Sequence, residues 1–199
     1  MKKDFVYLAS ASPRRSELLR QIGVAFQARP AEISEERLAG ETPEAYVVRL
    51  AAAKAETIFA STAADARPVL AADTAVVLDG EVLGKPETEA EAAAMLERLS
   101  GRSHRVLTGV ALRHAAGVET RLSESEVRFR ATTAAERQAY CRTGEPFDKA
   151  GGYGIQGHAA VFVEELKGSY SGVVGLPLYE TAALLERCGL GFWLTARAA

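Results

Sequence analysis

The chain has 199 residues, of which 48% are hydrophobic and 25% charged, and its formal net charge is -2. These are the proportions of an ordinary globular protein, and a pI of about 6.0 excludes the overall basic field with which many proteins attract nucleic acid or anionic membrane. No apolar run is long enough to span a membrane or to form a secretory signal. We therefore expect a cytoplasmic protein without nucleic-acid or membrane partners, folded as one domain over residues 1–199.

The first segment with a clear pattern is residues 5–23. An apolar run at residues 5–9 predicts a strand, and the helix that follows begins at Pro13, with Ser12 as its N-cap and Gly23 at its end. A strand, a tight loop and a helix are thus expected to open the chain.

Two arginines, Arg14 and Arg15, fall in the first turn of this helix. The helix dipole makes that end positive, so acidic residues are normally favoured there. A bound anion would remove the conflict, because free backbone N–H groups and bidentate guanidinium groups both bind phosphate well. The alternative is two solvated arginines, which would cost only a few tenths of a kcal/mol.

A polar stretch at residues 27–41 is expected to be a loop, and a helix follows from Pro43 to about Ala60 with Thr42 as its cap. Lys54 lies in the middle of the apolar face of this helix. Its ammonium group either extends along the stripe to solvent or points into an internal cleft that holds an anion.

Residues 69–78 are apolar on both alternating faces and predict a central strand with Asp73 in its middle. Because a lone buried carboxylate is costly, we favour a functional role for Asp73. Asp-Gly at residues 79–80 predicts a two-residue hairpin that pairs Thr74 with Lys85. Lys85 would then lie near Asp73, although the pleat can also place the two side chains on opposite faces.

The second half of the chain reads as alternating helices and strands. His104, in a polar loop at residues 101–104, fits a structural hydrogen bond better than catalysis. The expected elements are a helix capped by Thr88 and Glu91, strands at 105–113 and 118–130, a helix capped by Thr133 and Glu136, a strand at 159–166, a loop at 168–177 and a helix at 177–188.

The glycine-rich stretch at residues 145–157 contains a formal GxGxxG match. A dinucleotide fingerprint requires a preceding strand and a following helix, and neither is expected here, so we reject that interpretation. The glycines instead favour close backbone approach to a ligand, with Lys149 and Gln156 as polar contacts. A turn required only for backbone geometry would explain the glycines but not this polar pair.

The two cysteines, Cys141 and Cys188, have neither metal-ligand nor CxxC spacing. Both fall in helical patterns. We therefore expect reduced thiols without a disulfide.

Six motifs together resemble the Maf family of nucleoside triphosphate pyrophosphatases. They are Ser-Ala-Ser-Pro-Arg-Arg, Ala-Asp-Thr-Ala-Val, Gly-Lys-Pro, Ser-Gly-Arg-Ser-His, Asp-Lys-Ala-Gly-Gly-Tyr-Gly-Ile-Gln-Gly and Val-Gly-Leu-Pro, in that order. The resemblance covers nearly the whole chain. It implies an α/β fold like that of the inosine triphosphatases, with a long twisted mixed sheet, flanking helices and two lobes around a nucleotide cleft. It also implies a homodimer that uses a divalent cation, Mg²⁺ or Mn²⁺.

The resemblance also assigns site residues. Arg14, Thr74 and Gln156 match the subgroup that acts on dTTP and UTP, whereas a sister subgroup acting on 7-methyl-GTP has tryptophan, glutamine and glutamate there. Asp73 matches the aspartate that accepts a proton during hydrolysis and is also an expected metal ligand. Glu35 is the second expected metal ligand, although the motif around it departs from the family's usual Asp-Ile-Asp-Glu.

The expected reaction is hydrolysis of dTTP or UTP to the monophosphate and pyrophosphate. The cationic and polar groups assigned to the triphosphate are Ser10, Arg14, Arg15, Lys54 and Lys85. Two alternatives remain: a nucleotide-binding regulator of septation in which hydrolysis is incidental, and a 7-methyl-GTP pyrophosphatase.

Overall fold

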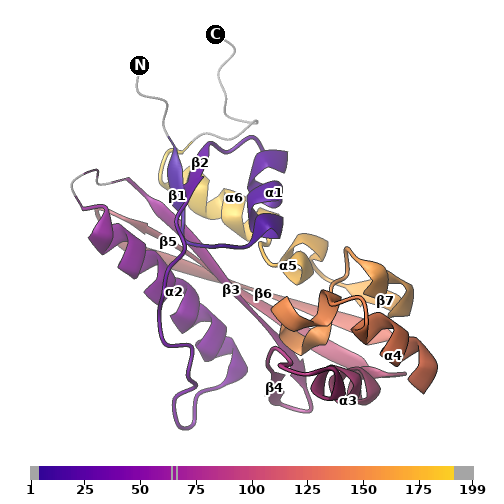
Figure 1. The fold of residues 1–199 in the computed structure, drawn as a ribbon. Coiled ribbons are helices and arrows are strands. Elements are labelled where there is room, and N and C mark those ends of the chain that lie inside the picture. The colour runs from indigo at the N-terminus through magenta and orange to yellow at the C-terminus, as the bar shows by residue number, and fades with distance from the viewer. Residues whose placement is uncertain (1–4, 64, 66, 191–199) are drawn as a thin grey trace. The chain divides into compact units, whose positions relative to one another are not determined.

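The fold is α/β, with a mixed seven-stranded sheet in the described residues, which are 5–63, 65 and 67–190 of a computed structural model (Figure 1). The strand order is β2-β1-β3-β5-β6-β7, and β4 pairs with β3. The strands are β1 (Val6–Leu8), β2 (Phe26–Ala28), β3 (Val69–Leu78), β4 (Glu81–Leu83), β5 (Ser103–His114), β6 (Gly117–Phe129) and β7 (Val163–Lys167). Strand β1 is parallel to β2 and β3, whereas the β3–β4 and β6–β7 pairs are antiparallel. The predicted fold class is therefore confirmed.

Helices accompany these strands through the chain. The α-helices are α1 (Pro13–Gln21), α2 (Pro43–Ser61), α3 (Glu89–Leu99), α4 (Ala134–Cys141), α5 (Tyr170–Val174) and α6 (Leu178–Arg187). Short 3-10 turns lie at Glu145–Asp148, Ala150–Gly152 and His158–Phe162. In the described part of the chain no helix combines the length and hydropathy needed to cross a membrane.

The chain divides into two compact units. Unit 1 comprises the described parts of residues 1–73, 108–123 and 175–199, and unit 2 comprises residues 74–107 and 124–174. Each unit has its own buried apolar core. The single domain and the nucleotide cleft remain predictions.

The core of unit 1 forms where the small apolar face of α2 packs on the sheet. A Cβ atom placed on Gly109 of β5 would lie 2.5 Å from the backbone oxygen of Val47 in α2, so glycine permits this close approach. The packed core residues are Tyr7, Ala9, Ala51, Ala55, Ile58, Val69, Ala71 and Ala111.

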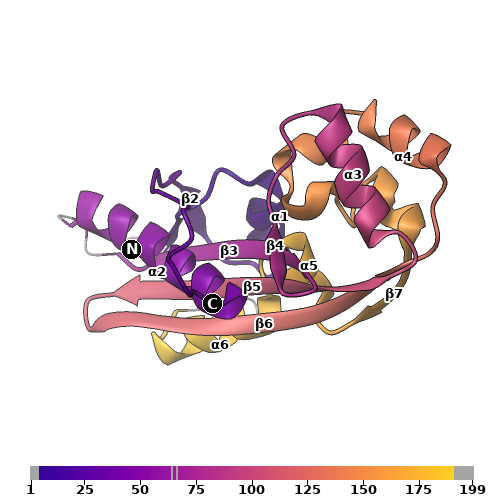
Figure 2. The same cartoon turned by 90° about the horizontal axis from the view of Figure 1, so that it is seen from below.

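The core of unit 2 contains larger side chains than the alanine-rich core of unit 1. Helices α3 and α4 contact each other and lie side by side (Figures 1 and 2). Leucines and aromatic rings fill the space between these helices and the strands of the unit, including Leu96, Leu99, Phe129, Tyr140, Tyr153 and Phe162.

Two predicted helix caps are confirmed. The side chain of Thr42 accepts a hydrogen bond from the N–H of Ala45 at 3.2 Å. Thr133 and Glu136 form the full capping box, since each side chain accepts from the backbone N–H of the other. The local sequence signals were therefore sufficient to predict where α2 and α4 begin.

Two other caps differ from prediction. Thr88 accepts from the Glu91 N–H, but the Glu91 carboxylate accepts from the N–H of Glu87, so the box is only half formed. Ser12 is the N-cap of α1 by position, yet its side chain makes no capping bond. Its N–H donates instead to Ser10 Oγ at 3.1 Å, which fixes the loop before the helix.

Several boundaries also needed correction. Strand β2 and helix α5 lie in stretches predicted to be loops, and residues 159–162 form a 3-10 turn where a strand was expected. In the β3–β4 hairpin, Leu78 pairs with Glu81 and Val76 with Leu83, as predicted. Strand β4 ends there, so the expected pairing of Thr74 with Lys85 was wrong. Strand β5 begins at Ser103, so half of the expected polar loop is strand.

Candidate active site

A buried ammonium group joins two carboxylates in unit 1. Lys54 Nζ donates to Asp73 Oδ1 at 2.6 Å and lies 2.5 Å from Glu35 Oε1. The side chains of Lys54 and Asp73 are each 11% exposed, whereas that of Glu35 is 47% exposed. Of the two predicted positions for Lys54, the inward one is therefore correct, and its charge meets carboxylates.

The sequence places these groups through two regular elements and one loop. Asp73 lies in β3, a strand buried on both faces, where its neighbours Ala71 and Ala72 are small. Lys54 follows Leu50 by one turn on the inner face of α2. Glu35 comes from the loop before that helix. Strand and helix thus fix the aspartate and the lysine, while the glutamate depends on loop conformation.

The environment of Asp73 shifts its proton affinity. Burial raises the pKa of Asp73 above its ordinary value, and the nearby negative charge of Glu35 acts in the same direction. Lys54 and Arg15 oppose this shift but do not cancel it. The carboxylate is therefore a better proton acceptor than an exposed aspartate, and it lies beside the ammonium group of Lys54.

Arg15 is anchored at the same side of unit 1 by backbone and hydroxyl oxygens. Its Nε donates to the carbonyl oxygen of Gly175 at 2.8 Å, and its Nη1 donates to Ser10 Oγ at 3.2 Å. Burial lowers the pKa of Arg15, an effect partly offset by Asp73. The half-buried guanidinium is thus held in one orientation, which an exposed arginine would not be.

Arg14 is half-buried in the first turn of α1, next to Arg15. Its positive charge contributes to lowering the pKa of Arg15. The first turn contains no acidic residue. The concentration of positive charge that the sequence indicated at this helix end is therefore present.

Tyr46 and Arg49 hold the loop that carries Glu35, and sequence analysis missed both. Tyr46 Oη donates to the backbone oxygen of Glu35 at 2.9 Å, and Arg49 donates to that of Glu36 at 3.0 Å. Arg49 also binds Glu41, which lowers the pKa of that carboxyl to about 2. The available signal was helical spacing, because Tyr46 and Lys54 lie eight residues apart on one side of α2.

The structure brings together only part of the predicted site. Ser10 joins Arg15, and Glu35 and Asp73 join Lys54, all within unit 1. Arg14 adjoins Arg15 in the first turn of α1. The remaining three predicted residues belong to unit 2, where Thr74 is half-buried and Lys85 and Gln156 are exposed. Their approach to the carboxylates stays a prediction.

Aromatic side chains of unit 2 support the glycine-rich segment that carries Gln156. His104 Nε2 and Tyr153 Oη are 2.7 Å apart, and both rings pack edge-on against Phe129. Burial lowers the pKa of His104 to about 4, so the imidazole is neutral near pH 7. His104 is therefore the structural hydrogen-bonder that its sequence context favoured.

Glu145 holds the other end of this segment. Its carboxylate accepts from Tyr140 Oη and from the backbone N–H of His158, both at 2.9 Å. Lys149, expected to contact a ligand, donates to the backbone oxygen of Glu145 at 2.7 Å and pairs with Asp148. Sequence analysis missed Glu145 and Tyr140, because nothing local indicates this partnership.

The carboxylates of Asp73 and Glu35 have the chemistry of a magnesium or manganese site. Both contact one cationic atom, Lys54 Nζ, at 2.5 Å and 2.6 Å. Mg²⁺ commonly takes one or two protein carboxylates and completes its shell with substrate phosphates and water. The residues therefore fit such an ion, which would compete with Lys54 for the carboxylate oxygens.

Comparison with known proteins places the chain in a family. The family model described as Maf-like protein matches residues 5–188. The dTTP/UTP pyrophosphatase of Methylobacillus flagellatus is 52% identical over 93% of this chain and 93% of its own length. That of Cupriavidus pinatubonensis is 52% identical over 95% of this chain and 99% of its own, and that of Aromatoleum aromaticum is 51% identical over 92% and 95%.

These matches extend along nearly the whole chain and include every predicted site residue by position. The α/β fold with its mixed sheet agrees with them. The chain belongs to the Maf family.

Proposed function

We propose that the protein hydrolyses dTTP and UTP to the corresponding monophosphate and pyrophosphate. The observation that carries this proposal is the pair of carboxylates, the buried Asp73 and the exposed Glu35, that both contact the buried ammonium of Lys54. A protein that only bound polyanions would gain nothing from carboxylates there, because they repel phosphate. The names of relatives 51–52% identical over most of the chain support the same substrates.

The cationic groups of the site bind the triphosphate in this proposal. Arg15 is already oriented by Ser10 and Gly175, so little side-chain entropy is lost when a phosphate oxygen binds. Arg14 and Lys54 add charge on unit 1, and Lys85 adds charge from unit 2. Together they stabilise the negative charge that develops on the departing pyrophosphate.

Asp73 takes the proton in the chemical step. A divalent ion held by Asp73 and Glu35 would neutralise charge on the phosphates. Asp73 accepts a proton from the water whose oxygen forms the new bond to the α-phosphorus, while the bond from that phosphorus to the bridging oxygen of the β-phosphate breaks. The raised pKa of Asp73 suits a base that must hold this proton. Glu35, on the more exposed side, serves with Asp73 as metal ligand.

Recognition of the base is assigned to unit 2 and the opening helix. Gln156 carries both a donor and an acceptor, as the imide edge of uracil or thymine requires. Thr74 and Arg14 complete the set that matches the pyrimidine subgroup. The support for this assignment is the resemblance of these three positions, together with the exposure of Gln156 on a segment fixed at both ends.

The experiment measures pyrophosphate release from UTP, dTTP, 7-methyl-GTP and the other common nucleoside triphosphates with Mg²⁺ or Mn²⁺. We expect UTP and dTTP to be turned over fastest, and Asp73→Asn to lower kcat by about 100-fold or more while the fold is kept. Glu35→Gln should weaken the affinity for the metal ion. Glu36→Gln, in the adjacent exposed position, serves as the matched control.

Preferential turnover of 7-methyl-GTP would move the protein to the sister subgroup. Nucleotide binding without turnover, measured by calorimetry in the presence of either metal, would favour the regulatory alternative. Near-normal turnover by folded Asp73→Asn would refute the assigned base.

A homodimer and a cytoplasmic location complete the proposal. The resemblance supports the first, and the nature of the substrates supports the second. Light scattering of the purified protein and fractionation of cells that express it test them separately.

A further inference from the structure

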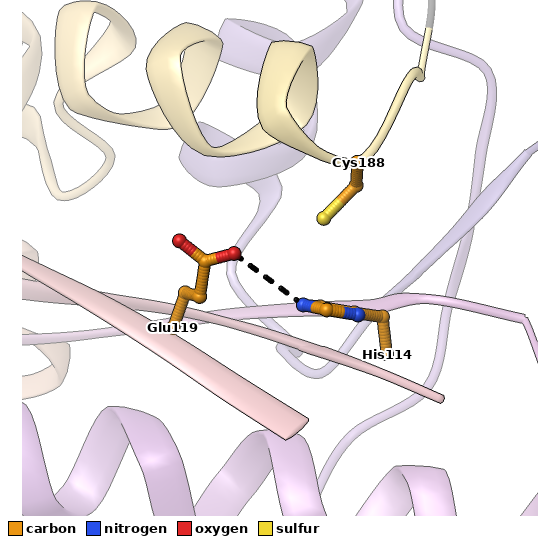
Figure 3. Close-up of side chains that lie close together, drawn as sticks. All are labelled: His114, Glu119 and Cys188. Atoms are coloured by element: carbon orange, nitrogen blue, oxygen red, sulfur yellow. Dashed lines mark ion pairs between the residues drawn. The ribbon is translucent and has the colours of Figure 1, made fainter. Parts of the chain in front are cut away.

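A histidine, a glutamate and a cysteine that are not part of the candidate active site converge in unit 1. His114 ends β5, Glu119 lies in β6 and Cys188 follows α6. One ligand atom from each lies within 4.8 Å of the others, and the three side chains point toward one another (Figure 3). Elements distant in sequence thus contribute three potential metal ligands to one place.

The geometry between the first two ligands already approaches that of a metal site. His114 Nε2 and Glu119 Oε1 are 3.5 Å apart. Two ligands about 2.0 Å from a tetrahedral Zn²⁺ lie about 3.3 Å from each other. His114 Nε2 is buried and makes no hydrogen bond with the described residues. Its charged partner there, Glu119 Oε1 at 3.5 Å, is too distant for a good hydrogen bond, and a metal ion between the two atoms would satisfy both.

The other groups around the cluster are compatible with a bound cation. Arg187 pairs with Glu119 Oε2 at 2.7 Å, which orients the carboxylate so that its Oε1 faces the histidine. Such contacts to the outer oxygen of a ligating carboxylate are common at metal sites. The N–H of Ala116 donates a long hydrogen bond of 3.4 Å to His114 Nδ1, and metal binding through Nε2 would replace this weak bond.

Cys188 supplies the ligand that determines which metal fits. Burial and the nearby Glu119 raise the pKa of its thiol, so it is protonated in the metal-free protein. A divalent ion displaces this proton and binds the thiolate. A set of imidazole, carboxylate and thiolate favours Zn²⁺ over Mg²⁺, because Mg²⁺ prefers oxygen ligands alone.

We propose that His114, Glu119 and Cys188 bind one Zn²⁺ or a similar transition-metal ion, with water as the fourth ligand. The ion would join the end of α6 to the turn between β5 and β6. This site shares no residue with Asp73 and Glu35. It is therefore independent of the proposed hydrolysis.

Cobalt provides a direct test, because a thiolate bound to Co²⁺ gives a charge-transfer absorption band that oxygen ligands do not give. We expect one equivalent of Co²⁺ to produce this band in the full chain and Zn²⁺ to displace it. Cys188→Ala should abolish the band, whereas Cys141→Ala, which removes the buried thiol of unit 2, should leave it unchanged. His114→Gln and Glu119→Gln should each weaken binding by roughly 100-fold.

Three results would overturn the proposal. One is absence of the band in the unmodified chain. Another is its persistence in Cys188→Ala or its loss in Cys141→Ala. The third is unchanged Co²⁺ affinity in His114→Gln, a variant that also serves if circular dichroism shows that Cys188→Ala does not fold.

Discussion

Two buried polar clusters in this protein handle charge in opposite ways. In unit 1, Lys54 and Asp73 are both nearly buried and ionic, and they meet at 2.6 Å beside the exposed Glu35. In unit 2, His104 and Tyr153 are equally buried and meet at 2.7 Å, but both are neutral near pH 7. The first cluster keeps its charges by pairing them, and the second buries groups whose charged forms are suppressed.

The difference indicates what each unit contributes. In an ionic cluster with one exposed member, the carboxylates can exchange the ammonium for a metal ion and the ammonium can exchange a carboxylate for a phosphate, because every charge there needs a partner. A neutral cluster of stacked rings gains little from a charged ligand and instead fixes backbone position. Unit 1 is thus suited to chemistry on a polyanion, and unit 2 to holding the segment that carries Gln156.

The largest expected effect comes from removing the cation of the ionic cluster by Lys54→Met. Asp73 then loses its partner, and the free energy of unfolding should fall by about 3 kcal/mol at pH 8. Burial already raises the pKa of Asp73, so stability due to its protonated form is present at low pH and is lost as pH rises through the folded-state pKa. Urea unfolding should therefore show a smaller deficit at pH 5 than at pH 8.

The matched control is the double variant Lys54→Met with Asp73→Asn, in which no carboxylate is left unpaired. It should regain much of the stability lost at pH 8. If the deficit of Lys54→Met is equal at both pH values, the cluster is not ionic in the sense proposed.

A somewhat smaller effect is expected from the neutral cluster on acidification. The pKa of His104 is lowered from 6.5 to about 4, so the unfolded chain binds a proton between these values and the folded chain does not. Stability is then fully present above pH 6.5 and falls by up to about 3 kcal/mol as pH drops toward 4. His104→Gln should remove this component of the pH dependence, which unfolding at a series of pH values would measure. An unchanged slope would mean that His104 is not protected from protonation.

The smallest losses of stability are expected when one tyrosine in each unit is replaced by phenylalanine. Tyr140→Phe removes the hydrogen bond to Glu145 from the core of unit 2, and we expect a loss of about 1.5 kcal/mol in thermal or urea unfolding. Tyr46→Phe removes the bond to the exposed loop at Glu35, and its stability cost should be about 0.5 kcal/mol. The reverse order would show that the Glu35 loop is the more firmly held region.

Much of the fold was predictable because its signals are local. The apolar run at residues 69–78 became β3 with the same bounds, and Asp79-Gly80 formed the expected turn with Asp79 at a φ of 53°. The buried charges were also detectable, since Asp73 and Lys54 interrupt otherwise apolar patterns. A charge in such a position needs a partner of opposite sign, and here Asp73 and Lys54 are each other's partner.

The parts that could not be predicted depend on contacts between distant residues. Strand β2 is three residues long and exists through its pairing with β1, which no local pattern shows. The partnership of His104 with Tyr153 joins residues 49 apart, and the approach of Cys188 to His114 joins the end of α6 to a strand. Spacing along the sequence shows no local metal motif at Cys188, and it has no bearing on side chains that the fold brings together from distant positions.

The bond from Arg15 to the carbonyl oxygen of Gly175 spans 160 residues. During synthesis the first helix leaves the ribosome long before its partner has been made. The arginine therefore reaches its final orientation only when translation is nearly complete. A nascent chain that already contains Asp73 and Lys54 still lacks this hydrogen bond. Nucleotide turnover should therefore begin only near the end of translation.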